Sequence, residues 1–170
     1  MAQPRLQFTR ADYDRLPEDF RVELIDGALL KMASPTVSHQ QIVRRLFLAL
    51  VDAIGQERML FGPVDFVIDD LNVVVPDVVA LEREPEKGTR NLEEALLVAE
   101  ILSPSTARRD RTVKTDLYLG AGVREVWLVD AEAQAIDIRS GAGTETAGVG
   151  DVARSRVLSG FAVPAQDLFR

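Results

Sequence analysis

The chain carries a carboxylate inside its most apolar stretch. From Ala95 to Leu102, seven of the eight residues are apolar, and the exception is Glu100. A continuous apolar run of this length is typical of a central strand that is covered on both faces. A buried carboxylate is costly unless it is paired, hydrogen-bonded or bound to a metal ion. The run therefore predicts a layered fold whose central strand supplies a polar group.

A second acid interrupts another apolar segment. Residues 73–81 are apolar except for Pro76-Asp77, and proline marks an edge or a bulge, where a side chain can be redirected. Taken singly, Asp77 and Glu100 are each compatible with a strand-end carboxylate that pairs with an arginine or with loop amides. Two such acids in apolar strands indicate a shared cation site.

The other elements are groups of strands separated by two longer helices, without strict alternation, internal repeats or a dividing linker. We expect a short helix at 11–16, strands 21–25 and 28–32 around an Asp26-Gly27 turn, and a helix capped by Ser38 and Gln41 that ends near Gly55. Strands follow at 59–68 with a break at Gly62-Pro63, at 73–81 and at 95–102, then a helix at 106–119, strands at 125–130 and 135–139, a mobile loop at 140–151 and a last strand at 152–158. This order predicts a mixed α/β sandwich in one domain, 1–170.

Composition narrows the chemistry. The 170 residues include no cysteine and one histidine, His39, which excludes disulfides, thiolate metal sites and multi-histidine metal sites. With neither a long apolar segment nor a secretion signal, we expect a cytoplasmic protein that does not bind membranes. The net charge of −7 argues against a protein that coats nucleic acid. It does not argue against an enzyme whose acidic cleft binds a divalent metal.

Lys114 is the third candidate for the polar site. It lies one turn after Asp110 in the expected helix, and this order of acid and base favours a surface salt bridge. The same helix face carries Leu117 and Tyr118, however, and it must turn towards the sheet to bury Leu117. That alternative brings Lys114 towards the two acids.

The chain resembles the PD-(D/E)XK nuclease superfamily in the order of its polar residues. Pro76-Asp77 comes first, Glu100 follows in an apolar strand, and a lysine comes after it. The chain is more closely similar to the superfamily's Uma-two branch of restriction-endonuclease-like proteins, over about residues 13–169. The segments that carry this similarity are Glu23 to Gly27, Ser34-Pro35 with His39, Pro76-Asp77, Glu100 to Thr106, Arg109-Asp110, Lys114, Tyr118, Gly122-Val123 and Trp127 to Asp130. Leu102 stands where the superfamily has its lysine, so Lys114 is taken as the replacement.

The resemblance implies a restriction-endonuclease-like mixed β-sheet flanked by helices, and a metal-dependent endonuclease that hydrolyses phosphodiester bonds in DNA. Asp77 and Glu100 would hold Mg²⁺ or Mn²⁺, a role that suits oxygen ligands. Glu23 would be an accessory ligand or would orient water. Lys114, charged at neutral pH, would orient water or stabilise the charge of the transition state.

Three further residues are candidates for substrate binding. His39 has either a structural role at the start of its helix or a contact to a substrate phosphate. Arg109, with its arginine neighbours, either faces solvent or neutralises a nucleic-acid backbone. Tyr118 is either a core residue or a core residue whose hydroxyl is tied to the site. Glu23 also has a second interpretation, as an exposed charge on the hairpin.

Other functions remain open from the sequence. A catalytically inactive module of the same fold would bind nucleic acid or protein and would use its carboxylates structurally. A nuclease directed at RNA would have the same composition. A homodimer is compatible with cutting of both DNA strands, because that reaction needs two sites.

Overall fold

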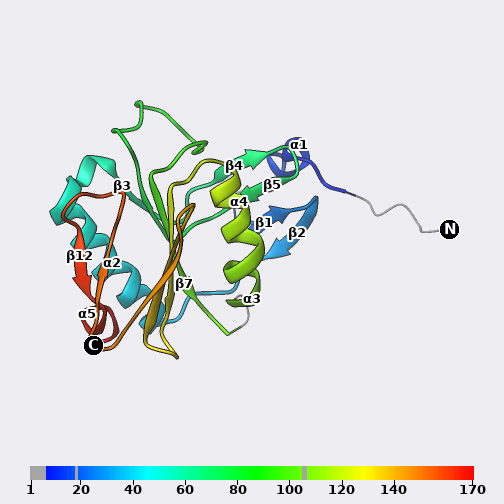
Figure 1. Cartoon of the computed structure of the whole chain (residues 1–170). Coiled ribbons are helices and arrows are strands. Elements are labelled where there is room, and N and C mark those ends of the chain that lie inside the picture. Colours follow the sequence, from blue (N-terminus) through cyan, green and yellow to red (C-terminus); the bar gives the residue numbers. More distant parts are fainter. Residues whose placement is uncertain (1–6, 18, 105–106) are drawn as a thin grey trace.

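A six-stranded mixed sheet forms the centre of the computed structural model, which describes residues 7–17, 19–104 and 107–170 (Figure 1). Its strand order is β10-β9-β8-β7-β6-β3. Strands β7 and β8 run parallel, and the other neighbouring pairs are antiparallel. The strands are β3 (Met59–Phe61), β6 (Val78–Ala80), β7 (Leu97–Leu102), β8 (Glu125–Asp130), β9 (Ala135–Ser140) and β10 (Gly143–Gly148).

Strand β7 is the buried central strand that the apolar run predicts. Every residue of β7 is buried, between β6 and β8. Its side chains alternate between two cores: Leu97, Ala99 and Ile101 pack in one, and Val98 and Leu102 in the other. Because side chains alternate along a strand, Glu100 lies on the face of Val98 and Leu102.

Helices cover both faces of this sheet. Figure 1 shows α2 (Val37–Ile54) on one side, with α5 (Ala165–Phe169) below it, and α4 (Thr115–Gly120) on the other side. Helix α4 continues a short α3 (Ala107–Arg109) and a π-helical turn, η2 (Asp110–Lys114). Glu100 therefore faces the α4 side, where Tyr118 packs. No helix in the described part of the chain is long and apolar enough to cross a membrane.

A second sheet packs beside α4, in the order β2-β1-β5-β4. It contains the predicted hairpin of β1 (Val22–Ile25) and β2 (Ala28–Lys31), in which Glu23 lies opposite Leu30. Asp26 and Gly27 both have positive φ, 50° and 72°, as the predicted turn requires. The smaller elements are α1 (Arg10–Tyr13), η1 (Gln56–Arg58), β4 (Phe66–Asp69), β5 (Asn72–Val74), β11 (Val152–Arg154) and β12 (Ala162–Pro164).

The expected strands 59–68 and 73–81 each divide between the two sheets. Strand β3 belongs to the large sheet and β4 to the small one, while β5 belongs to the small sheet and β6 to the large one. The second crossing is at Pro76-Asp77, where proline has no N–H to donate to a ladder. The predicted break is thus confirmed, and it places Asp77 at the point where the sheets diverge.

Three sequence predictions are wrong. Helix α2 starts before Ser38: its N-cap is Thr36, in an extended conformation directly after Pro35, and the Thr36 side chain accepts a hydrogen bond from the amide of His39 (3.2 Å). The expected loop 140–151 contains strand β10, which pairs along its length with β9. A backbone ladder needs no apolar side chains, and Thr146 adds a hydrogen bond to Asp137 (2.8 Å). The expected last strand, 152–158, is shortened to β11, and a further strand, β12, follows and pairs with it.

Candidate active site

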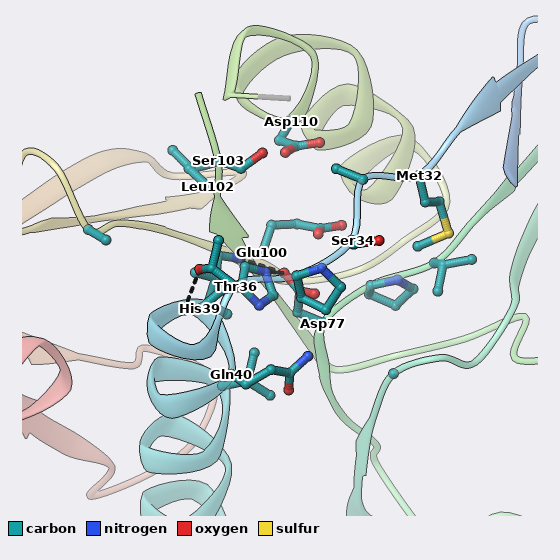
Figure 2. A pocket seen from close by; sticks show the side chains of 18 of the residues that line it. Met32, Ser34, Thr36, His39, Gln40, Asp77, Glu100, Leu102, Ser103 and Asp110 are labelled. Carbon is teal, nitrogen blue, oxygen red and sulfur yellow. Dashed lines mark hydrogen bonds and ion pairs between the residues drawn. The ribbon is translucent and has the colours of Figure 1, made fainter. Parts of the chain in front are cut away.

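A pocket of about 330 Å³ lies where the two sheets diverge, at the start of α2. All four predicted catalytic residues line it, and so do two of the three candidate substrate-binding residues: Glu23, Asp77, Glu100 and Lys114, with His39 and Arg109. Figure 2 shows Asp77, Glu100 and His39 converging in its interior, with Asp110 across from them. The pocket therefore brings together residues from β1, from the position before β6, from β7 and from η2. A shared cation site was predicted from two of them, Asp77 and Glu100.

Lys114 is buried among carboxylates. Its Nζ lies 2.7 Å from Oε1 of Glu23, 2.7 Å from Oε1 of Glu100 and 3.8 Å from Oδ1 of Asp110. The side chain is 4% exposed, so the interpretation as a surface salt bridge is wrong. Burial lowers the pKa of Lys114, but the carboxylates of Glu100, Glu23 and Asp110 raise it by more. The ammonium group is therefore charged at neutral pH.

The π-helical turn η2 ends at Lys114 and is anchored to the large sheet. Thr115 donates its hydroxyl to the carbonyl of Asp110 (2.8 Å). Arg111 donates to Asp130 (2.6 Å) and forms an ion pair with Asp137, so strands β8 and β9 hold the turn. Single π-helical turns occur often at functional sites. Arg111 is consequently engaged with the protein's own acids.

Glu23 is fully engaged by the protein. Its Oε1 accepts a hydrogen bond from the amide of Val75 (3.0 Å) and contacts Lys114, while Oε2 lies 3.6 Å from Nη2 of Arg109. The side chain is 3% exposed, so the interpretation as an exposed hairpin charge is wrong. Strand β1 thus supplies a carboxylate that fixes both Lys114 and Arg109 in the pocket.

Asp77 and Glu100 come from adjacent antiparallel strands. The pairing of Val78 with Ala99 places them side by side at the next position of the register. Oδ2 of Asp77 accepts a hydrogen bond from the amide of Ile101 (2.8 Å), and Oε1 of Glu100 accepts one from Tyr118 (2.6 Å). Among the described residues, no hydrogen bond reaches Oδ1 of Asp77 or Oε2 of Glu100. Each carboxylate therefore keeps one oxygen for another ligand.

The pocket holds more acids than cations. Five acids line it, against three permanent positive charges: Glu23, Asp77, Glu100, Asp110 and Glu132, against Lys114, Arg109 and Arg21. Burial raises the pKa of Glu100. The Lys114 ammonium lowers it, but the other carboxylates raise it again, and the result is a pKa well above the usual range. A bound cation would offset this excess of negative charge.

The side chains of the site offer oxygen atoms as ligands, and oxygen ligands suit a hard cation. Mg²⁺ prefers oxygen ligands, and it commonly uses one or two carboxylates with water and substrate phosphate completing the shell. Asp77 and Glu100 match that demand with their two remaining oxygens. Within residues 7–17, 19–104 and 107–170, no group of three or more His, Cys, Asp or Glu side chains is placed to hold a metal ion. A cation here would depend on water and substrate for the rest of its ligands.

Comparison with known proteins decides the family. The model of the Uma2 family, described as "Putative restriction endonuclease", matches residues 10–165. The chain belongs to the Uma2 family. This membership supports nuclease function. No match was found among the curated proteins.

A solved structure has the same fold as this Uma2 chain. It is the crystal structure of "a putative nuclease belonging to DUF820 from Anabaena variabilis", with a TM-score of 0.82 and 20% sequence identity. The alignment covers 95% of this chain and 97% of that one. The expected nuclease-like α/β fold, a mixed sheet flanked by helices, is thereby confirmed.

His39 of the Uma2 chain contacts an acid of the site. Its Nε2 lies 3.3 Å from Oδ2 of Asp77, and its Nδ1 is buried without a partner among the described residues. Burial lowers the pKa of His39, but the hydrogen bond and charge of Asp77 raise it by more. The side chain that caps helix α2 is that of Thr36. The side chain of His39 lines the pocket.

Sequence reasoning undervalued Asp110. It entered as the helical neighbour of Lys114 and as part of the Arg109-Asp110 segment, without a role in the site, yet it is buried and lines the pocket. Its spacing from Lys114 was the available signal, because residues four apart share a helix face. In the Uma2 chain that face is turned inward.

Tyr118 lies behind the pocket, and its hydroxyl donates to Glu100. Replacing Tyr118 with phenylalanine is expected to destabilise the protein by about 1.5–3 kcal/mol, because a buried hydrogen bond to a charged group is lost. Urea unfolding measures this change. Tyr13 is the chain's other tyrosine. Tyr13→Phe is the matched control, since Tyr13 bonds to the half-buried Asp65 (3.1 Å), and the loss should be smaller. Equal losses in both variants would contradict the special position of Tyr118.

Proposed function

We propose that this protein is a metal-dependent endonuclease that hydrolyses phosphodiester bonds in DNA. The observation that carries the proposal is the convergence of Lys114 with Glu100 and Asp77 in one pocket. A buried ammonium beside two carboxylates, each with an oxygen that accepts no hydrogen bond from the described residues, suits a reaction in which negative charge develops on phosphate oxygens. Membership of the Uma2 family supports the same class of reaction.

Asp77 and Glu100 would hold the metal, with Mg²⁺ or Mn²⁺ as the ion. When bound, the ion would polarise the phosphate and lower the pKa of an attacking water. Asp77 is suited to this role because its backbone partner, the amide of Ile101, fixes one oxygen and leaves the other available. Glu100 is fixed in the same way by Tyr118.

Lys114 would stabilise the transition state. An ammonium group has three N–H donors, and Glu23 and Glu100 lie within hydrogen-bond distance of two. Oδ1 of Asp110 lies 3.8 Å from Nζ, beyond hydrogen-bond distance, so the third donor would be offered to water or to a phosphate oxygen. Because its carboxylate neighbours keep it charged, Lys114 would orient water and offset charge rather than act as a base. Glu23, with both oxygens engaged, would be the residue that positions Lys114.

The test is cleavage of plasmid and single-stranded DNA in Mn²⁺. We expect cutting that EDTA abolishes, and that falls at least about a hundredfold in Asp77→Asn, the scale of losing one transition-state contact. Asp52→Asn, at an exposed position on α2, is the matched control and should retain activity. Cutting that persists in EDTA, or full activity in Asp77→Asn, would contradict the proposal.

The same assay separates the remaining alternatives. RNA of matching sequence is included, and faster cleavage of RNA than of DNA would contradict the DNA assignment. Absence of cleavage of either polymer in Mn²⁺ would favour the inactive binding module. If the protein is a homodimer, as cutting of both strands would require, sedimentation will show twice the mass of the chain.

A further inference from the structure

We infer that the pocket takes one unpaired nucleotide of a DNA strand, with Arg21 binding a neighbouring phosphate. The substrate would then be single-stranded or locally unpaired DNA rather than intact duplex. This inference rests on the proposed function and names the substrate class of the same site. Four observations carry it: the depth of the reactive groups, the size of the pocket, the nature of the walls and the charge at the mouth.

The reactive groups are deeply buried. Side chains of Glu23, Glu100 and Lys114 are 3–5% exposed, and even Asp77 is only 25% exposed. A scissile phosphodiester must therefore enter the pocket. The phosphates of a duplex lie on the outside of a stiff, wide rod whose major groove alone is about 12 Å across. An unpaired strand is flexible enough to bend a phosphate inward, as enzymes that extrude nucleotides require.

The size of the pocket matches one nucleotide rather than a longer tract. Its volume of about 330 Å³ is at the lower end of the range for small-molecule sites, roughly 300–1,000 Å³. Proteins that bind long single strands use successive aromatic side chains as stacking platforms. No Phe, Tyr or Trp is found in the lining among the described residues. The walls therefore offer no platform for a second or third base.

The walls suit the apolar face of a sugar and base. Pro35, Pro63, Pro76 and Pro104 line the pocket, half of the chain's eight prolines. Their rings are rigid and apolar, so they present fixed surfaces without loss of side-chain freedom. Met32 adds a flexible apolar contact, and Figure 2 shows its sulfur at the side of the pocket near Ser34. These groups do not read base edges, so recognition would depend on shape.

The positive charge of Arg21 suits the binding of a single DNA strand. Arg21 lines the pocket and is exposed, and no carboxylate of the described residues lies within ion-pair distance of it. Arg109 and Arg111, in contrast, are engaged by Glu23 and by Asp130. Duplex binding needs many phosphate contacts, because the duplex carries one charge per about 1.7 Å of axis against about 3.4 Å for each strand. Among the described residues that line the pocket, Arg21 is the arginine without an ion pair, and this one charge matches the lower charge density of a single strand.

The test is fluorescence anisotropy in Ca²⁺ with one labelled oligonucleotide in three forms: alone, in a perfect duplex, and in a duplex with a central unpaired run. We expect the single strand and the interrupted duplex to bind at least about tenfold more tightly than the perfect duplex, because unpairing a nucleotide has to be offset by binding. Arg21→Gln should weaken binding of the single strand by about fivefold, the scale of an exposed ion pair. Lys87→Gln, in a remote loop, should leave it unchanged.

Equal or tighter binding of the perfect duplex would overturn the inference, as would no binding of any form. Equal effects of Arg21→Gln and Lys87→Gln would overturn the role of Arg21. Cleavage of the three forms in Mn²⁺ separates this inference from the proposed function. A perfect duplex cut as fast as the single strand supports the nuclease and overturns the substrate class. A binding preference without cleavage of any form supports the unpaired-strand site and contradicts the nuclease.

Discussion

Lys114→Met is expected to destabilise the protein by about 3–5 kcal/mol at neutral pH, the scale of breaking a buried ion pair. The substitution keeps the apolar stem but leaves Glu23 and Glu100 buried without the ammonium that lies 2.7 Å from each. Urea unfolding followed by circular dichroism measures the change. Cleavage should be lost in the same variant, because the charge that would offset the transition state is gone.

A double variant makes this prediction specific. Glu23→Gln combined with Lys114→Met removes one of the two buried carboxylates that have lost their ammonium partner, so part of the lost stability should return. Additive losses, in contrast, would indicate that the two residues do not interact. Lys87→Met is the control for loss of a lysine and should leave stability unchanged. A Lys114→Met protein as stable as the parent would contradict the buried network.

Divalent metal is expected to stabilise the parent protein by about 2.7 kcal/mol when its free concentration is a hundred times the Kd. Asp77→Asn should abolish this gain, because it removes one of the two carboxylates proposed to hold the ion. Without metal, the variant should be as stable as the parent or slightly more stable, since one of the crowded acids is neutralised. Thermal unfolding with and without Mn²⁺ measures both effects.

Two controls accompany the metal experiment. Asp52→Asn loses a carboxylate outside the pocket and should keep the full gain. Mn²⁺ and Mg²⁺ are tested in parallel, since both accept oxygen ligands. If Asp77→Asn retains the gain, the ion binds elsewhere and the role assigned to Asp77 is wrong.

Local patterns in the sequence predicted the elements that hold the site. The apolar run around Glu100 predicted β7, and Asp26-Gly27 predicted the hairpin that brings Glu23 inward. These features depend on burial and turn conformation, which a short segment largely determines. The helix face shared by Asp110, Lys114 and Tyr118 followed from helical periodicity in the same way.

Other features depend on contacts between distant segments. The anchoring of η2 through Arg111 needs Asp130 and Asp137 from strands that follow later in the chain, so the arginine alone indicated only a charged helix. The crossing at Pro76 was visible as a break, but its two sheets were not, because sheet membership is set by pairing partners. Strand β10 was missed since its polar side chains give no apolar alternation.

The central claim is that Asp77 and Glu100 form a divalent metal site. Calorimetric titration of Mn²⁺ into the purified protein, beside Glu100→Ala, tests it without any choice of substrate. The account predicts binding of one ion per chain in the parent protein and no binding heat in the variant. Absence of binding in the parent, or the same binding in Glu100→Ala, would contradict the account.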